Sequence, residues 1–291
     1  MTGRDPAVRR RRTRLEPVPG RAPASGGPLR RGDSAQRRRL ILESVQDLGQ
    51  AEVERLAARF GVTASTIRRD LARLSADGQL VRTYGGAVAR GGPETSLSQR
   101  SGQADQAKRA MAEWASRQVE AGQTVFFDAG SSVAAVARAL PPVEGLTVVT
   151  TSLSVIGWLA DRSDLVLECL GGRLRGLSQA FVGPAAEAGL ERWTFDAAFL
   201  GCDGVDPRLG LCEADQDQAR LKAMVVERTA RVYVLAHAAK LKVAPFHSWT
   251  RLARPWTLVT DASPDQVARA GFEGGRVTVV SLRPEQEPDP A

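Results

Sequence analysis

The chain has 291 residues, 43% of them hydrophobic, and a formal net charge of +7 at pH 7. This length suits one large or two medium domains, and the lack of any long apolar run excludes a membrane-spanning helix and a secretory signal, so we expect a cytoplasmic protein. The three cysteines and two histidines lack metal-ligand spacing, which favours free thiols in a reducing compartment and predicts neither a metal site nor a cofactor.

Basic residues are concentrated in the N-terminal third of the chain. Residues 1–90 hold 19 lysines and arginines against 9 acids, whereas the remainder holds 21 against 24. A basic head on a slightly acidic body is typical of a nucleic-acid-binding domain joined to a separate domain. Twelve of these basic residues lie within residues 1–40, so a basic tail on an unrelated protein would give a similar balance. Residues 1–33, rich in arginine, proline and glycine, are predicted to be a disordered leader.

Two helices are predicted after this leader. A helical period begins at Gln36 and ends at Gly49, with Ile41 and Val45 on its apolar face. A second, shorter helix places Val53, Leu56, Ala57 and Phe60 on one face and ends at Gly61. Each glycine follows the last apolar residue of its period, as at a helix C-terminus.

The next stretch, TASTIRRDLARL, predicts a third helix that begins after an N-cap at Thr63. Its apolar residues Ile67, Leu71 and Leu74 fall within about 60° on a helical wheel and must face a core. Two short extended segments then flank the tripeptide at residues 84–86, as in a small hairpin. Three helices and a hairpin predict an α+β winged helix-turn-helix domain over residues 34–90, followed by a polar linker at 91–102.

The polar face of the third helix carries the candidate DNA contacts. In a helix-turn-helix domain the N-terminal residues of the recognition helix reach base edges, and arginines also neutralise phosphates. The hairpin adds one arginine that would grip the backbone or the minor groove. The expected DNA-binding residues are Thr63, Ser65, Thr66, Arg68, Arg69, Arg73 and Arg82. A solvated basic helix face is the alternative interpretation.

From about residue 103 apolar strands alternate with helices. The strands are TVFF, LTVVT, LVLECL, AAFLG, RVYVLA, TLVT and VTVV. Nearly continuous apolar strands separated by helices predict an α/β domain with a mostly parallel, doubly wound sheet over residues 103–283. We expect a disordered tail at 284–291.

Small, hydroxylated and charged residues follow these strands where a parallel sheet binds its ligands, beyond the carboxyl ends. Serines opening a helix favour an anion, aspartates can accept hydrogen bonds from sugar hydroxyls, and lysine pairs with phosphate. The pattern predicts a pocket for a phosphorylated polyol, whereas turn geometry alone also favours Gly, Ser and Asp. The candidate residues are Asp128, Gly130, Ser131, Ser132, Thr151, Ser152, Arg173, Asp203 and Lys240.

Residues 55–87, RLAARFGVTASTIRRDLARLSADGQLVRTYGGA, resemble the DNA-binding domain of the DeoR family of bacterial transcriptional regulators. The stretches DAGSS, VVTTS, LGGRLRGLSQAFVG, AFLGCDGVD, LAHAAK and VTD resemble that family's sensor domain, whose fold is related to sugar-phosphate isomerases. The resemblance covers residues 34–282 and adds the helix lysine Lys222 to the expected effector residues. It implies repression of a carbohydrate-catabolic operon, with double-stranded operator DNA, a phosphorylated sugar effector, and a homo-dimer or homo-tetramer.

The sequence departs from the family pattern in the expected pocket. Thr151 replaces a common Asn, Gln218 replaces a Glu, and His237-Ala238-Ala239-Lys240 replaces Asp-Ser-Ser-Lys. These changes remove two acids and two hydroxyls, so a DNA-binding regulator whose pocket senses nothing stays open as an alternative. An isomerase-like enzyme is not expected, because Gly204 replaces an acid of the isomerases' loop and no positioned base with its acid partner is found.

Overall fold

The computed structural model describes residues 34–48, 50–77, 79–82, 86–89 and 94–282. The predicted leader, 1–33, and tail, 284–291, lie outside the described residues. Within the described part of the chain, no helix combines the length and apolar character needed to cross a bilayer.

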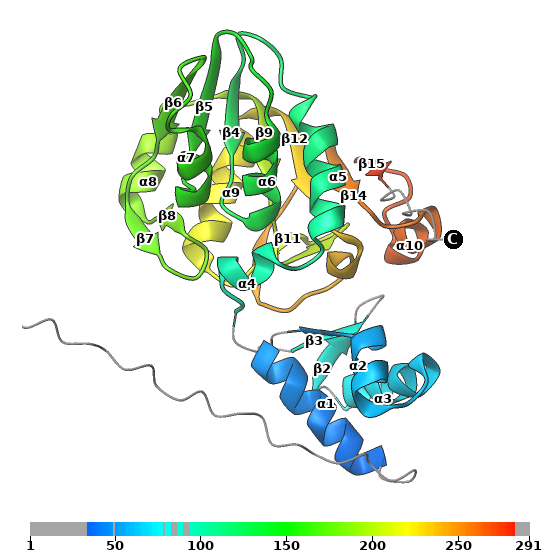
Figure 1. Cartoon of the computed structure of the whole chain (residues 1–291). Helices are drawn as coiled ribbons and strands as arrows, with labels where there is room; N and C mark the ends of the chain where they lie inside the picture. Colours follow the sequence, from blue (N-terminus) through cyan, green and yellow to red (C-terminus); the bar gives the residue numbers. More distant parts are fainter. Residues whose placement is uncertain (1–33, 49, 78, 83–85, 90–93, 283–291) are drawn as a thin grey trace, which may run out of the picture.

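The N-terminal domain consists of three helices and a small sheet (Figure 1). The helices are α1 (Ser34–Leu48), α2 (Val53–Phe60) and α3 (Ala64–Ala76). Gly61 ends α2 in the left-handed conformation at φ 62°, where a residue without a Cβ is favoured. Thr63 begins α3 as predicted, because its hydroxyl accepts a hydrogen bond from the Thr66 amide at 3.3 Å.

Apolar residues of all three helices form one core, which contains Ile41, Leu56, Ile67 and Leu71 as the helical periods predict. An ion pair adds to it: Arg37 Nε of α1 lies 2.6 Å from Asp70 Oδ2 of α3, and the Asp70 side chain is only 6% exposed. Asp70 therefore joins the first helix to the third from within the sequence TIRRDL.

The small sheet is antiparallel, in the order β1-β3-β2. Its strands are β1 (Gln50–Glu52), β2 (Leu80–Arg82) and β3 (Gly86–Ala89), so the predicted hairpin is confirmed and β1 is an additional strand. The pairing of β1 with β3 requires glycine at position 86, because a Cβ there would lie 2.0 Å from the Ala51 carbonyl oxygen. A short helix, α4 (Leu97–Ser101), follows in the segment that leads to the second domain.

The C-terminal domain is built on a seven-stranded sheet in the order β15-β14-β12-β9-β4-β5-β6, and all six neighbouring pairs are parallel. The predicted parallel α/β architecture is therefore confirmed. Its strands are β4 (Thr124–Phe127), β5 (Leu146–Thr150), β6 (Leu165–Cys169), β9 (Phe195–Leu200), β12 (Thr229–Leu235), β14 (Trp256–Thr260) and β15 (Val277–Ser281).

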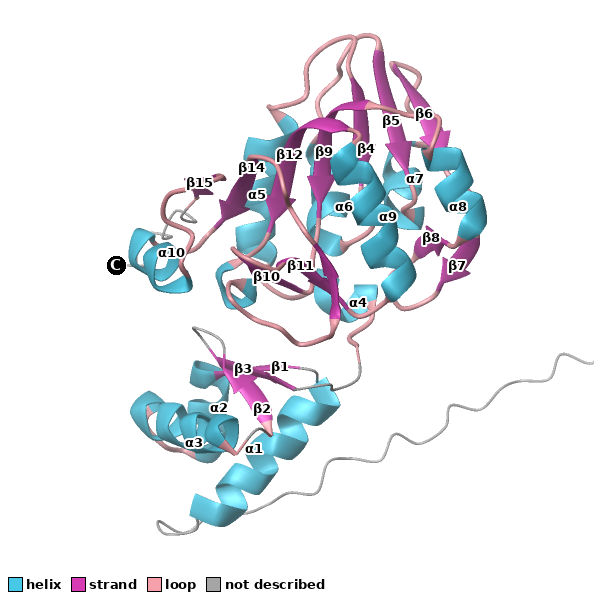
Figure 2. Ribbon diagram, turned by 180° about the vertical axis from the view of Figure 1, so that it is seen from behind, coloured by secondary structure: helices cyan, strands magenta, loops and turns pink. Residues whose placement is uncertain are grey.

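Helices cover both faces of this sheet (Figures 1 and 2). Those on one face are α5 (Asp105–Ser116), α6 (Ser131–Ala139) and α7 (Leu153–Leu159), and those on the other are α8 (Pro184–Leu190), α9 (Gln216–Glu227) and α10 (Pro264–Ala270). Alternate strand residues point to opposite faces of the sheet. Phe127 and Phe199 therefore belong to the core beneath α5, α6 and α7, while Phe126 and Ala198 belong to the core beneath α8, α9 and α10.

Short antiparallel strands that the sequence analysis did not predict lie beyond the carboxyl ends of the parallel strands. They are β7 (Arg173–Arg175) with β8 (Ala180–Val182), and β10 (Gly204–Asp206) with β11 (Gly210–Glu213) and β13 (Ser248–Thr250). A single turn of 3-10 helix, η1 (Ala238–Lys240), follows β12. In Figure 1 this edge of the domain, together with α4, lies toward the N-terminal domain.

Candidate DNA-binding surface and effector pocket

Helix α3 divides into a buried and an exposed face. Ile67, Leu71 and Leu74 are at most 4% exposed. The side chains of the opposite face reach solvent, and those expected to meet DNA are Thr63, Ser65, Arg68, Arg69 and Arg73, with Thr66 half-buried beside the cap. The packing of the apolar face thus leaves a continuous basic and hydroxylated surface free.

The three arginines of α3 differ in what they contact. Arg68 lies 3.5 Å from Glu54 of α2, and both side chains are more than half exposed. In the part of the chain that the structure describes, neither Arg69 nor Arg73 forms an ion pair. Arg82 ends β2, but its side chain lies outside the described residues. Arg69 and Arg73 thus carry positive charges that no described carboxylate neutralises.

The second site is a pocket at the carboxyl ends of the parallel strands. Gly130, at φ 146°, turns the chain from β4 into α6, whose first-turn amides are free to meet an anion. The cavity has a volume of about 20 Å³, close to the space of one water molecule. Its lining residues are Glu94, Arg100, Ala129, Gly130, Ser131, Ser132, Gly201, Cys202, Glu213, Gln218, Lys222 and Lys240.

A buried ion cluster forms the floor of the pocket. Lys222 Nζ contacts Glu213, lies 3.1 Å from Asp128 Oδ2, and donates to the Gly201 carbonyl at 2.8 Å. Burial would lower the pKa of Lys222, but the charges of Asp128 and Glu213 outweigh it and raise that pKa above its usual value. Burial also raises the pKa of Glu213, and the Lys222 charge opposes this rise. The lysine is therefore a buried cation that contacts two acidic side chains.

A second group of cations has no carboxylate partner. Lys240 Nζ donates to the Cys202 carbonyl and Lys108 Nζ to the Arg100 carbonyl, and no described carboxylate lies within ion-pair distance of either ammonium. Burial, with Lys240 and Arg100 nearby, lowers the pKa of Lys108 to about 8. Burial and the same lysines lower the pKa of His237 to about 3, so its imidazole is neutral at pH 7. The pocket wall therefore holds one such ammonium group, that of Lys240, and the ammonium group of Lys108 lies near it, so that an anion in the pocket would offset both charges.

Comparison with known proteins agrees with this two-part organisation. The family model of the DeoR C terminal sensor domain matches residues 103–262, and that of the DeoR-like helix-turn-helix domain matches residues 37–90. This chain belongs to the DeoR family of transcriptional regulators.

Relatives of this DeoR-family regulator match along most of their length. It is 36% identical to the HTH-type transcriptional regulator GlpR of Haloferax volcanii, over 84% of this chain and 97% of that one. It is 29% identical to the glycerol-3-phosphate regulon repressor of Escherichia coli K12, over 79% and 91% of the two chains. The full-length sorbitol operon regulator SorC of Klebsiella pneumoniae aligns over 84% of this chain and 96% of that one, with a TM-score of 0.35 and 13% identity.

The structure brings together some of the DeoR-family regulator's expected effector residues. Gly130, Ser131, Ser132, Lys222 and Lys240 line the cavity. Asp128 lies beneath it, bound to Lys222 and to the Gly201 amide at 3.0 Å. Asp203 lies beside it, where it accepts from Arg100 at 3.0 Å and from the Ala214 amide at 3.2 Å.

Three expected effector residues lie apart from the cavity lining. Arg173 is 65% exposed and pairs with Asp217 at 2.9 Å, on the outer side of β7. Ser152 caps α7 by accepting from the Val155 amide at 3.3 Å. Thr151 is 3% exposed, and its carbonyl accepts from the Phe181 amide. All three follow strands along the chain, but the residues after β5 pair with β8, through the bridge from Ser152 to Ala180, and do not line the cavity.

The sequence analysis missed several residues that this regulator's pocket contains. Glu94 and Arg100 belong to the segment predicted as a linker and Glu213 to β11, and all three line the cavity. Arg175 of the unpredicted strand β7 lies beside the lining and contacts Glu94. None of these residues directly follows a strand of the parallel sheet, which is where the sequence predicts ligand contacts. The pattern RLR at 173–175 gives no signal that separates Arg175 from Arg173, because residues two apart in a strand point to the same face.

Proposed function

We propose that this protein represses a carbohydrate-catabolic operon by binding double-stranded operator DNA through α3, and that a phosphorylated sugar in the C-terminal pocket controls this binding. Residues 34–90 would form the DNA-binding domain and 103–283 the effector-sensing domain of a cytoplasmic homo-dimer or homo-tetramer. The observation that carries the proposal is the free basic face of α3, with Arg69 and Arg73 unpaired among the described residues. Such a face supplies both base contacts and phosphate contacts.

The cations of the pocket support an anionic effector. Among the described residues, Lys240 of the lining and Lys108 beside it lack carboxylate partners, and Ser131 begins α6, whose N-terminus favours negative charge. A phosphate group has the charge and the acceptor oxygens to satisfy these donors. The names of the relatives refer to different sugars and polyols, among them an L-fucose operon activator of Haemophilus influenzae and the glycerol-3-phosphate regulon repressor. These names support a phosphorylated sugar or polyol as the class of effector, but they do not single out one compound.

The state of the two aspartates argues against catalysis. A general base must be free to take a proton from its substrate. Asp128 is held by Lys222 and the Gly201 amide, and Asp203 by Arg100 and the Ala214 amide. The relatives described above are named as transcriptional regulators and repressors, which supports a regulator without enzymatic activity.

Titration of the full chain with DNA from upstream of its own gene tests the proposal. We expect preference over scrambled DNA, weaker binding as salt is raised, and release by at least one member of a panel of sugar phosphates. Equal binding to scrambled DNA would overturn the DNA-binding part. If no sugar phosphate stabilises the protein in thermal unfolding, the pocket is a non-sensing one.

The pH dependence of anion binding tests the lysine wall of the pocket. The pKa of Lys108 is lowered to about 8, so its charge is fully present below that pH and is lost above it. We expect the affinity for sulfate, whose own charge is constant, to fall as the pH rises from about 7 to 9. Calorimetric titration measures this. The Lys108→Gln variant should bind sulfate more weakly and show a smaller step, because the remaining step comes from Glu213 of the lining, whose pKa burial also raises. A step of equal size in that variant would contradict the assignment.

A further inference from the structure

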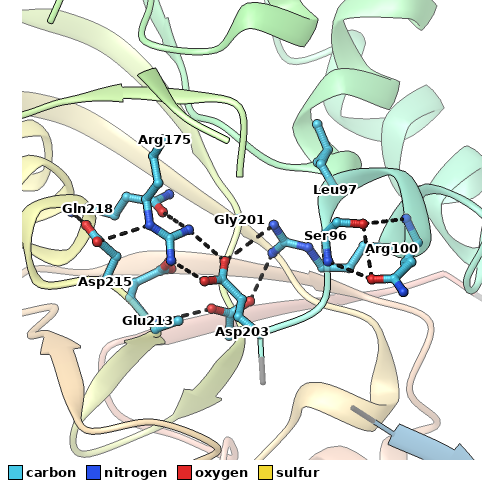
Figure 3. Close-up of polar contacts among 12 residues, drawn as sticks. Ser96, Leu97, Arg100, Arg175, Gly201, Asp203, Glu213, Asp215 and Gln218 are labelled. Carbon is cyan, nitrogen blue, oxygen red and sulfur yellow. Dashed lines mark hydrogen bonds and ion pairs between the residues drawn. The ribbon is translucent and has the colours of Figure 1, made fainter. Parts of the chain in front are cut away.

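A carboxylate from the segment between the two domains lies in the pocket of the second domain. Glu94 contacts Arg175 of β7 through both carboxylate oxygens, one of them 2.8 Å from Nη1, and lies 3.9 Å from Nη2 of Arg100. The Glu94 side chain is only 8% exposed, and both arginines are 15% exposed. In Figure 3 Arg175 and Arg100 extend toward each other from opposite sides. Two guanidinium groups thus enclose one carboxylate.

The two arginines are held in place by groups other than Glu94. Asp215 accepts from Nε of Arg175 at 3.0 Å, and Gln218 from its Nη1 at 3.2 Å. Asp203 accepts from Nη1 of Arg100 at 3.0 Å, while Nε and Nη2 of Arg100 are buried and have no hydrogen-bond partner among the described residues. Buried donors without partners are rare and costly. The arrangement is therefore a preformed anion subsite with donor capacity to spare, and Glu94 satisfies it incompletely.

Glu94 also begins the stretch that attaches the interdomain segment to the sensor domain. The Leu97 amide donates to the Leu177 carbonyl at 2.7 Å, and Leu97 is 5% exposed. Ser96 and Gln99 form a capping box that starts α4, which carries Arg100. With Glu94 and Arg100 in the pocket lining, only about 20 Å³ is left. This volume is below the space that a sugar phosphate needs, since ligand pockets measure about 300 Å³ or more.

We propose that Arg175 and Arg100 form an anion subsite for a phosphate group, that Glu94 occupies it as an internal ligand, and that an entering phosphate displaces Glu94 and detaches residues 94–101 from the sensor domain. The effect of this displacement on DNA binding rests on the proposed function, because residues 94–101 lead to the proposed DNA-binding domain. A phosphate offers more charge and more acceptor oxygens than one carboxylate, so it satisfies the unpaired Arg100 donors as well as the fork of Arg175. A ligand that binds only the detached state shifts the population toward it.

The Glu94→Gln variant tests the proposal, with Asp217→Asn as the matched control. Asp217 also pairs with an arginine of β7, but this pair is exposed, and no hydrogen bond or ion pair joins it to the described part of the interdomain segment. Glutamine preserves the size of Glu94 and removes its charge. In the full chain without DNA, we expect the amides of residues 96–101 to exchange about tenfold faster in Glu94→Gln. Asp217→Asn should exchange like the unaltered protein.

Inorganic phosphate provides the second measurement. In the unaltered protein, saturating phosphate should accelerate exchange of the same amides, and in Glu94→Gln it should bind about tenfold more tightly because the internal competitor is gone. Unchanged exchange in Glu94→Gln overturns the proposal, and equal phosphate affinity in both proteins marks an adventitious ion only and also overturns it. If Glu94→Gln is misfolded by circular dichroism, Arg175→Lys replaces it, because lysine keeps the charge but loses the bidentate fork. These readouts need no DNA, so a failure to bind operator would count against the proposed function alone.

Discussion

Replacing Lys222 by methionine is expected to lower the free energy of unfolding of the C-terminal domain by about 3–5 kcal/mol. The lysine is 3% exposed and contacts Glu213 and Asp128, whose side chains are 5% and 6% exposed. Methionine fills similar space but leaves two carboxylates buried without their counter-ion. The cost arises from those uncompensated charges rather than from the loss of a favourable pair.

Urea unfolding followed by tryptophan fluorescence measures this effect. All five tryptophans lie at or after position 114, so the signal reports the C-terminal domain alone. The control is Arg220→Ala on the same helix, whose guanidinium is 70% exposed and pairs with Glu187 at 2.9 Å. An exposed pair contributes about 0–1 kcal/mol. Equal losses of unfolding free energy in the two variants would contradict the prediction, because the buried ion cluster would then contribute no more than the Arg220 pair.

Replacing Arg69 by alanine is expected to weaken operator binding by about 1–3 kcal/mol, which is roughly 5–150-fold. Arg69 is exposed on the N-terminal half of α3, and no described carboxylate neutralises it. A bidentate contact with a base edge would be lost without an effect on the core, since Ile67 and Leu71 point the other way. Binding to scrambled DNA should change much less than binding to the operator.

Fluorescence anisotropy at several salt concentrations measures both affinities. Arg39→Ala is the control, because Arg39 is 81% exposed in the same domain but lies on α1 and pairs with Glu43. Arg73→Ala should weaken operator and scrambled DNA alike and reduce the salt slope by about one, as expected for a phosphate contact. An operator affinity unchanged by Arg69→Ala would make Arg69 part of a solvated helix face.

The pattern of the sequence determined the elements and their inner faces. Ile67, Leu71 and Leu74 recur at the helical period and are buried, and Thr63 caps α3 as its hydroxyl predicts. Each of the seven predicted apolar stretches corresponds to a strand of the parallel sheet. These features are local, because the spacing of apolar residues specifies which side of an element is buried.

The pocket was predictable only where it follows a strand of that sheet. Gly130, Ser131 and Lys240 come after parallel strands, and the shared direction of those strands brings them to one edge. Arg173 satisfied the same rule, yet it is 65% exposed and pairs with Asp217, whereas Arg175 is 15% exposed and contacts Glu94 and Asp215. Residues two apart in a strand point to the same face, so this difference arises from the charges that surround each arginine, and no local pattern specified it.

Only the tertiary structure decided which charges meet. Arg175 and Glu94 are 81 residues apart in the chain, and Arg100 and Asp203 are 103 apart. No periodic pattern in the sequence predicts either pair, since each partner alone resembles an ordinary surface charge. The interdomain segment meets β7 at Arg175 and the turn between β9 and β10 at Asp203, where these charges are buried together. Burial strengthens their pairing. The sequence by itself determined the helices of the N-terminal domain and a parallel sheet, because both arise from local spacing. The folded chain decided that Glu94 of the interdomain segment lies between Arg175 and Arg100.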